Sequence, residues 1–355
     1  MKRARHKRLK KLAAVAAVVV FALCALFLWA SGGVQKPRTF DGPISDYAPD
    51  AAEPPRVSGS IVLLTWNISY AYGAGSEGEG YAPRSADELA RRLDRIGAVI
   101  RDSGADVVFL QEVDFNSARS ARVDQLRELA RVTGLRYAAR AVTWKAGYVP
   151  FPYWPPRSHF GAMCSGTAVL SRLPITANRV TLHPKPSSNS WLRNAFYAFR
   201  STEVAEIQCG GRTLLAVNSH LEAWDKANRA AQAGALAATV EKLAASGCML
   251  AFGGDLNTVP PEAAVKTGFP DAPDDYQNDT TLSILRNVSG IKDVIDESAY
   301  RQSESPYFTF PAAAPNRRLD YLFVSKEAAV ADARVIQAGD LSDHLPLRAQ
   351  ITLTP

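Results

Sequence analysis

The sequence predicts an α/β fold, because short apolar runs alternate with amphipathic helical segments along most of its 355 residues. Residues 61–64, 107–110 and 249–252 are continuous apolar runs, as expected for strands buried on both faces. Residues 85–104 and 223–245 carry apolar residues at helical spacing. Since 47% of the residues are apolar, the chain can bury a sizeable core.

The N-terminal segment has the charge pattern of a membrane anchor. Residues 1–11 contain seven cations and no acid, and residues 12–30 contain no charge. Nineteen uncharged residues are about the length that crosses a bilayer core as a helix. The cationic flank favours the cytoplasmic side, which places the rest of the chain outside the cytoplasm. We therefore expect residues 1–30 to form a single-pass anchor with a cytoplasmic N-terminus.

A cleaved signal peptide is the alternative for this segment. Its apolar region would be unusually long, and Leu28-Trp29-Ala30 is a poor cleavage site, so we favour the uncleaved anchor. Without the seven N-terminal cations the formal net charge of +6 becomes −1, so the body of the protein has no basic signature of nucleic-acid binding. Residues 31–60 are rich in Pro, Gly and Asp, lack an apolar period, and are expected to be a linker.

The four cysteines are too few for a disulfide scaffold and lack the spacing of a metal site. Cys209 and Cys248 lie at the margins of predicted strands. A disulfide between them outside the cell is one interpretation, and inert buried thiols are the one that we favour.

Residues 61–355 are expected to form one domain, which begins with a strand that ends at Asn67. Ser85-Ala-Asp-Glu88 is a capping box that predicts the start of a helix, and Gly104 marks its end. The next predicted strand ends in Glu112. Because an unpaired buried carboxylate is costly, this position indicates a function, and an exposed strand end is the alternative.

The middle of the domain contains one irregular segment and one clear hairpin. Residues 123–134 predict a helix that ends at Gly134. Residues 137–160 combine aromatic residues with four prolines, and are either a packed loop or an aromatic surface over the site or against a membrane. Residues 204–219 read as a hairpin with a tight glycine turn, and its second arm leads into His220.

A motif of two glycines, an aspartate and an asparagine follows the apolar run at residues 249–252. Gly253 and Gly254 are expected to allow a tight turn. Asp255 and Asn257 stand two residues apart and so point the same way on an extended chain. The carboxylate can orient a water molecule or take its proton, and the amide can donate to a phosphate oxygen. A turn that caps the strand is the alternative.

Further polar residues stand where other predicted strands begin. Asp320 lies at the start of one strand, and Asp343 and His344 precede the last. In a mixed sheet these starts can share one edge with the strand ends described above. Acids gathered in one place repel each other unless a cation lies among them. Oxygen ligands without cysteine favour Mg²⁺ or Mn²⁺, and such a site suits phosphate ester hydrolysis.

Six short motifs, taken in order, resemble the endonuclease/exonuclease/phosphatase superfamily. They are Thr65-Trp-Asn67, Gln111-Glu112, Asn218-Ser-His220, Gly254-Asp-Leu-Asn257, Arg318-Leu-Asp-Tyr321 and Ser342-Asp-His344. That superfamily includes deoxyribonuclease I, exonuclease III, neutral sphingomyelinases and inositol-polyphosphate 5-phosphatases. The resemblance covers residues 61–355 and implies a catalytic domain with a four-layer α/β sandwich, in which two mixed sheets pack face to face with helices outside.

The resemblance also implies roles for the residues in these motifs. Glu112 is a metal ligand, Asn67 supports the metal or the phosphate, and Asp343 binds the metal directly. The ion is Mg²⁺ or Mn²⁺. Asp255 orients or deprotonates the attacking water, and Asn257 holds a phosphate oxygen.

The remaining motif residues surround the phosphate. His220 either stabilises charge or protonates the leaving group, and a histidine here resembles the deoxyribonuclease I and sphingomyelinase branches. Asp320 pairs with His344 and fixes its tautomer. Arg317 and Arg318 are either phosphate contacts or a solvated pair.

Together these observations predict a membrane-anchored phosphodiester hydrolase that acts on lipid headgroups or similar phosphoesters. A nuclease outside the cytoplasm, similar to deoxyribonuclease I, is one alternative. The other is a binding scaffold with the same fold, which would be expected to have lost ionisable site residues, and none is missing. The resemblance implies no protein partner, so we expect a monomer.

Overall fold

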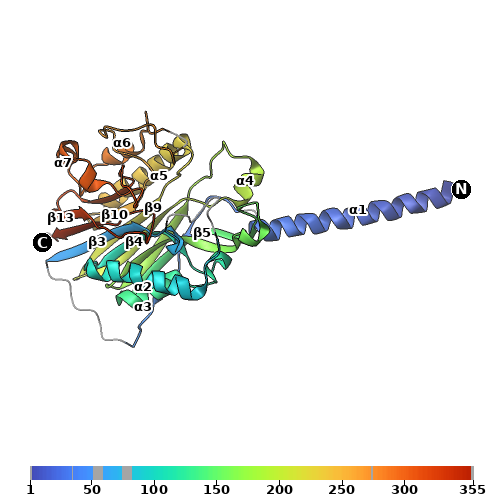
Figure 1. The fold of residues 1–355 in the computed structure, drawn as a ribbon, viewed down its shortest axis with the longest axis horizontal. Coiled ribbons are helices and arrows are strands. Elements are labelled where there is room, and N and C mark those ends of the chain that lie inside the picture. The colour runs from blue at the N-terminus through green and yellow to red at the C-terminus, as the bar shows by residue number, and fades with distance from the viewer. Residues whose placement is uncertain (1, 34, 51–58, 74–81, 273–274, 353–355) are drawn as a thin grey trace.

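Two seven-stranded mixed sheets pack face to face in the computed structural model, which describes residues 2–33, 35–50, 59–73, 82–272 and 275–352 (Figure 1). The first sheet contains, in spatial order, β1 (Thr39–Asp41), β7 (Ile175–Leu182), β8 (Ser201–Cys209), β9 (Arg212–His220), β10 (Met249–Asp255), β12 (Asp320–Ser325) and β11 (Ile291–Asp293). The second contains β13 (Ala329–Val335), β14 (Leu347–Thr352), β3 (Ser60–Asn67), β4 (Val107–Asp114), β6 (Gly161–Ser171), β5 (Tyr137–Val149) and β2 (Ile44–Asp46). Parallel pairing joins β9 to β10 and β3 to β4, and the other neighbours are antiparallel.

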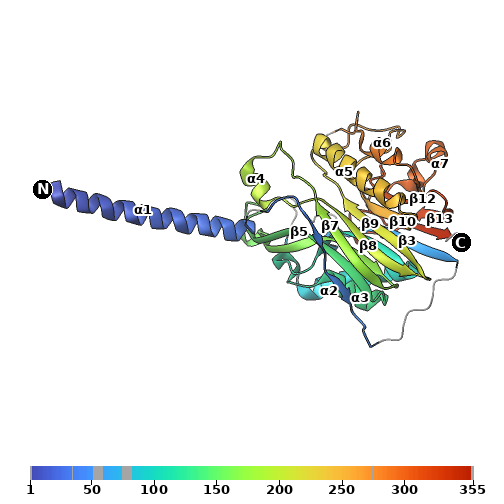
Figure 2. The same cartoon turned by 180° about the vertical axis from the view of Figure 1, so that it is seen from behind.

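Helices cover the outer face of each sheet and complete the predicted four-layer sandwich (Figures 1 and 2). They are α2 (Ala86–Asp102) and α3 (Gln125–Thr133) on the second sheet, α5 (Lys226–Ala244) and α6 (Thr281–Arg286) on the first, and the short helices α4 (Trp191–Phe196) and α7 (Glu297–Gln302). The helices cover these faces because both faces of the strands are apolar. Along β3, Leu64 and Trp66 pack with the helices, whereas Ile61 and Leu63 pack between the sheets.

Two local predictions about helix and turn chemistry are confirmed. The Ser85 hydroxyl accepts a hydrogen bond from the Glu88 backbone N–H at 3.2 Å, so the capping box begins α2. Gly210 and Gly211, with φ of 59° and 85°, form the turn between β8 and β9.

The segment expected to be least regular is in large part the longest strand. β5 spans 13 residues and pairs with β6 on one side and β2 on the other, so only residues 150–160 lack regular strand structure. The prediction was wrong because backbone hydrogen bonds to β6 hold the strand along its length, while its mixed apolar, aromatic and charged residues hide the period. Trp144 from this strand packs on Phe160 with ring centroids 5.9 Å apart.

The segment expected to be a linker also contributes to the sheets. β1 and β2, both within residues 31–60, pair with β7 and β5 at the sheet edges. An edge strand needs only backbone groups to pair, so it leaves no apolar pattern in the sequence. The Arg136 guanidinium lies 2.6 Å from the Asp46 carboxylate and fixes β2 in place. Folded structure therefore begins before residue 61.

Helix α1 (Lys2–Ser31) projects away from the sheets (Figure 1). Its part from Arg5 to Ser31 is long and apolar enough to cross a membrane, a property that signal sequences share. Only its last turns contact the body of the protein, mainly beside β5. The four cysteines are free, and Cys209 is buried.

The two glycines at the end of β10 do not form the tight turn that the sequence predicted. Both lie within the strand, which continues to Asp255. A Cβ at Gly253 would lie 2.6 Å from the Phe109 ring of the opposite sheet, and one at Gly254 would lie 2.1 Å from the Ser219 carbonyl oxygen. Glycine is required here because backbone and sheets approach closely.

Replacing Gly254 with alanine is therefore expected to lower the free energy of unfolding by roughly 1–3 kcal/mol, because the neighbouring strand must move. Gly234→Ala is the matched control, since this helical glycine has nothing within 4 Å of its added Cβ, and it should gain up to about 1 kcal/mol. Urea unfolding of both variants measures the difference. Equal stabilities would contradict the close-approach explanation.

A buried carboxyl group on β8 lies in a polar network between the sheets. Glu203 accepts hydrogen bonds from the Thr167 hydroxyl at 3.0 Å and from the Asn178 amide at 3.2 Å, and it is fully buried. Burial raises the pKa of Glu203 from 4.5 to about 8, although these hydrogen bonds oppose the shift.

This shift predicts a pH-dependent stability. As pH rises from 4.5 to about 8, the unfolded chain releases the Glu203 proton but the folded protein keeps it, so the free energy of unfolding falls. Above about pH 8 both states are ionised and the decline ends. Glu203→Gln stays neutral, so wild type should lose on the order of a few kcal/mol relative to this variant across that range. Urea midpoints at successive pH values test it, and parallel pH profiles would contradict it.

Candidate active site

Three predicted site residues form a row across neighbouring strands of the first sheet. Asp255, at the end of β10, stands opposite His220 of β9 and opposite Asp320 of β12 in the strand register. All three are buried. Like charges directly opposite each other repel, so the two aspartates need a positive charge beside them.

The second sheet supplies partners for this row. The Asn67 amide at the end of β3 donates to Asp255 Oδ2 at 3.0 Å. His344, just before β14, places Nδ1 2.8 Å from Asp320 Oδ2 and Nε2 3.6 Å from Asp255 Oδ2. His220 Nε2 lies 3.5 Å from the same Asp255 oxygen. The Asp255 carboxylate therefore contacts side chains from both sheets.

The surroundings give these groups different protonation states. Burial would lower the pKa of His344, but the Asp320 and Asp255 carboxylates raise it to about 10, so this imidazole is charged at neutral pH. Burial raises the pKa of Asp255 to about 6, while His344 opposes the shift. Burial, the Arg200 guanidinium and His344 together lower the pKa of His220, which is therefore neutral.

Asp343 and the backbone of His344 are tied to the end of β3. The Ser342 hydroxyl donates to the Asn67 carbonyl at 2.6 Å and lies 3.2 Å from Asp343 Oδ1. The Trp66 indole N–H donates to the His344 carbonyl at 2.9 Å. Asp343 is therefore adjacent to the Asn67 side of the site.

Glu112 does not end its strand as predicted, because β4 continues to Asp114, and it lies instead on a β-bulge. The register of β4 against β6 shifts between Leu110 and Val113. The shift changes the direction of the Glu112 side chain, and the Glu112 backbone has a positive φ of 55°. A left-handed conformation is uncommon for glutamate and tends to occur at functional sites. Glu112 lines a small pocket together with Arg200 and His220.

Asn257 also has a left-handed backbone, with φ of 50°. Its backbone N–H donates to Asp255 Oδ1 at 2.9 Å, and its amide donates to the Leu221 carbonyl at 3.0 Å. These bonds fix Asn257 beside Asp255, where β9 and β10 end.

Arg200 is a site residue that the sequence did not reveal. Its Nη1 lies 3.0 Å from Nδ1 and 2.9 Å from Nε2 of His220, and its Nε lies 3.8 Å from Glu222. It precedes β8 without a recognisable motif, and only the pairing of Ser201 with His220 brings it here. No pattern in the sequence could have found it.

Arg317 and Arg318 are not a solvated pair. Both are buried, and Arg318 makes two hydrogen bonds to Asp293, at 3.0 and 2.7 Å. Arg317 lies 2.5 Å from Asp271. These ion pairs hold the loop before β12, because a buried guanidinium must be neutralised by a partner.

The donor set fits a divalent cation. Ligand atoms of Asp255, Asp320 and His344 lie within 4.8 Å of one another, but the charged His344 imidazole has no free lone pair, so the ligands of a cation would be carboxylate and amide oxygens at this edge. Among the described residues, Asp320 Oδ1 has no hydrogen-bond partner although it is buried. Oxygen-rich donors without cysteine suit Mg²⁺ or Mn²⁺ better than zinc.

The fold and the motifs define the class of protein. Residues 64–344 match the model of the Endonuclease/Exonuclease/phosphatase family, so the chain belongs to this family. The observed four-layer architecture agrees with this assignment.

Solved structures of low sequence identity share the fold. An endonuclease/exonuclease/phosphatase from Beutenbergia cavernae DSM 12333 is 21% identical, with a TM-score of 0.58 over 83% of this chain and 72% of that chain. A mannosyl-6-phosphatase from Bacteroides thetaiotaomicron VPI-5482 is 13% identical, with a TM-score of 0.54 over 82% and 100%. Truncated TDP2 from Caenorhabditis elegans is 19% identical, with a TM-score of 0.51 over 83% and 98%. No curated protein matches the sequence.

Proposed function

We propose that the protein is a membrane-anchored hydrolase of phosphoesters that depends on a divalent metal, with phosphodiesters of lipid headgroups as its substrate class. The observation that carries this proposal is the Asp255 carboxylate, held among the side chains of Asn67, His220 and His344 where strands of both sheets end. Family members that hydrolyse phosphoesters support the reaction class.

Asp255 is suited to activate water. Its pKa of about 6 is close to the range in which a general base works at neutral pH. As the water oxygen bonds to phosphorus, the water proton passes to Asp255, the phosphorus–oxygen ester bond breaks, and the leaving oxygen departs as an alkoxide that takes a proton from solvent. Charged His344, oriented by Asp320, offsets the negative charge that gathers around Asp255.

Arg200, His220 and Asn257 are the residues that hold the phosphate. Arg200 supplies a permanent positive charge, and neutral His220 beside it donates a hydrogen bond rather than a proton. The Asn257 amide, already fixed by Leu221, has a second N–H for a phosphate oxygen. Glu112, Asn67 and Asp343 would hold Mg²⁺ or Mn²⁺, which when bound would polarise the phosphate and stabilise the departing oxygen.

The membrane setting rests on α1 and its flanking charges. Seven cations precede the apolar stretch, which favours a cytoplasmic N-terminus and a catalytic domain outside the cytoplasm. Without those cations the net charge is −1, which argues against a polyanionic nucleic acid as substrate.

The test is a hydrolysis panel with the full-length chain in detergent. We expect activity on phospholipid and on a chromogenic phosphodiester, loss of activity with EDTA, and recovery with Mg²⁺ or Mn²⁺. Glu112→Gln should reduce kcat/KM by about 100-fold or more, because it removes a charge that holds the metal. Glu327→Gln, at an exposed turn after β12, is the matched control and should retain activity.

Full turnover in metal-free buffer would contradict the metal requirement. Hydrolysis of DNA or RNA without hydrolysis of lipid would favour the nuclease. Inactivity on every phosphoester would favour a binding scaffold.

Asp320 and His344 are expected to act as one unit, because they are 2.8 Å apart and the carboxylate sets the tautomer and charge of the imidazole. Each single change to alanine should lower kcat by about 100-fold or more, and the double change should cost little more than the worse single change. Steady-state rates of the three variants, with circular dichroism to verify folding, measure this coupling. Losses that simply multiply would show that the two residues act separately.

A further inference from the structure

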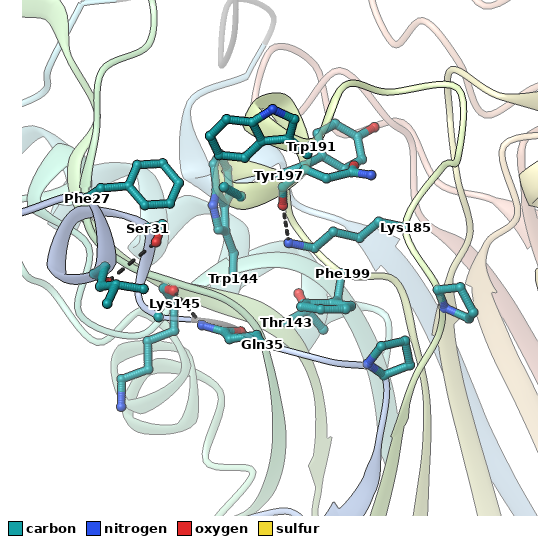
Figure 3. A pocket seen from close by; sticks show the side chains of 16 residues that line it. Phe27, Ser31, Gln35, Thr143, Trp144, Lys145, Lys185, Trp191, Tyr197 and Phe199 are labelled. Atoms are coloured by element: carbon teal, nitrogen blue, oxygen red, sulfur yellow. Dashed lines mark hydrogen bonds between the residues drawn. The ribbon is translucent and has the colours of Figure 1, made fainter. Parts of the chain in front are cut away.

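An apolar groove of about 520 Å³ lies where α1 meets the catalytic domain (Figure 3). Its walls come from three segments far apart in the sequence: the end of α1, the middle of β5 and the region around α4. The side chains that the argument uses are Phe27, Leu28, Trp144, Trp191, Tyr197 and Phe199. The groove is therefore built jointly by the membrane helix and the domain.

The groove lies at the depth of a membrane surface if α1 spans the bilayer. Residues 12–30 form about 28 Å of helix, close to the ~30 Å of a hydrocarbon core. Phe27 and Leu28 stand within the last turn of this stretch, so they mark the boundary between the hydrocarbon and the headgroups. Phe27 packs on Trp191 with ring centroids 5.7 Å apart, which brings the groove to that boundary.

Exposed apolar side chains surround this position. Trp29 is 60% exposed, Trp191 is 74% exposed and Leu192 is 50% exposed. Tryptophan is enriched at membrane interfaces, where its ring suits both the apolar and the wet side. This part of the domain thus has the surface of a protein seated on lipid.

The groove adjoins the catalytic pocket. Thr143, Trp144 and Phe199 line both the groove and the small pocket that contains Glu112 and His220. A molecule with its apolar part in the groove therefore lies next to the pocket that contains Glu112 and His220.

The charge of the groove complements a phosphate. Among the described residues that line it, the charged ones are Lys145 and Lys185. Lys185 Nζ donates to the Asn194 carbonyl at 2.7 Å and lies 4.1 Å from the centre of the Phe199 ring. Gln35 donates to the Lys145 carbonyl at 2.9 Å and ties the chain after α1 to β5. Lys185 thus places a cation in the wall of the groove beside Phe199.

We propose that this groove receives a hydrocarbon chain of a membrane phospholipid, so that the enzyme takes its substrate sideways from the bilayer beside α1 while the phosphate enters the catalytic pocket. The proposal rests on the proposed function and deepens it by assigning the lipid-chain subsite.

The proposal is tested by filling the groove with a larger side chain. Ala195 of α4 lines it, so Ala195→Trp occupies its volume, whereas Ala238→Trp adds the same side chain to the exposed face of α5 as a matched control. The full-length variants are reconstituted into vesicles of phosphatidylcholine and phosphatidylglycerol, and hydrolysis of the lipid is compared with that of soluble bis(p-nitrophenyl) phosphate. Ala195→Trp should lower kcat/KM for lipid by at least about tenfold, because excluding two buried methylene groups costs that much. Its rate on the soluble ester should stay unchanged, and Ala238→Trp should retain both activities.

A second measurement does not depend on turnover. Phosphatidylcholine with a photoreactive diazirine in its acyl chain should label the β5 peptide that contains Trp144 in wild type, and should not label it in Ala195→Trp. Labelling confined to α1, or a photo-crosslink between two copies of the chain in its place, would overturn the proposal. So would an equal loss of lipid and soluble activity in Ala195→Trp. If lipid chains label the groove but no phosphoester is hydrolysed, the proposed function fails and the lipid subsite stands.

Discussion

The hydrogen bond from Asn67 to Asp255 joins the two sheets at the edge where the candidate site lies, and the arrangement of that site depends on it. It can form only because the sheets approach closely, which Gly253 permits by leaving room for the Phe109 ring. Deeper between the sheets, Gln111 donates to Asn218 at 2.8 Å and maintains the same alignment. Side-chain hydrogen bonds across the apolar core therefore determine which strand ends of the two sheets lie together.

Charge balance is the second constraint on this edge. The register places Asp255 opposite Asp320, an unfavourable pair unless positive charge is added. His344 supplies it, and its raised pKa is the counterpart of that repulsion. His220, on the other flank, lies beside Arg200 and stays neutral. The two imidazoles are therefore chemically different, which suits them to different tasks in phosphate hydrolysis.

The end of α1 packs against segments that also border the candidate site. The helix contacts β5 and the region around α4, and these same segments wall the catalytic pocket. The segments that contact the end of α1 therefore also shape the candidate site. In the lipid hydrolase that we propose, such a shared wall would shorten the path from bilayer to phosphate.

The sequence by itself determined the α/β class, the apolar N-terminal segment and the placing of candidate residues at or beside the ends and starts of strands, except for Glu112, which lies on a bulge within β4. These are local properties, since apolar runs, capping residues and short motifs are written along the chain. Tertiary structure decided what depends on contacts between distant segments. β1 and β2 form because open sheet edges accept their backbone, and Arg200 joins His220 only through the pairing of β8 with β9. The groove at the base of α1 likewise forms only where three segments that are distant in the sequence meet. No sequence pattern within any one of them could therefore have predicted it.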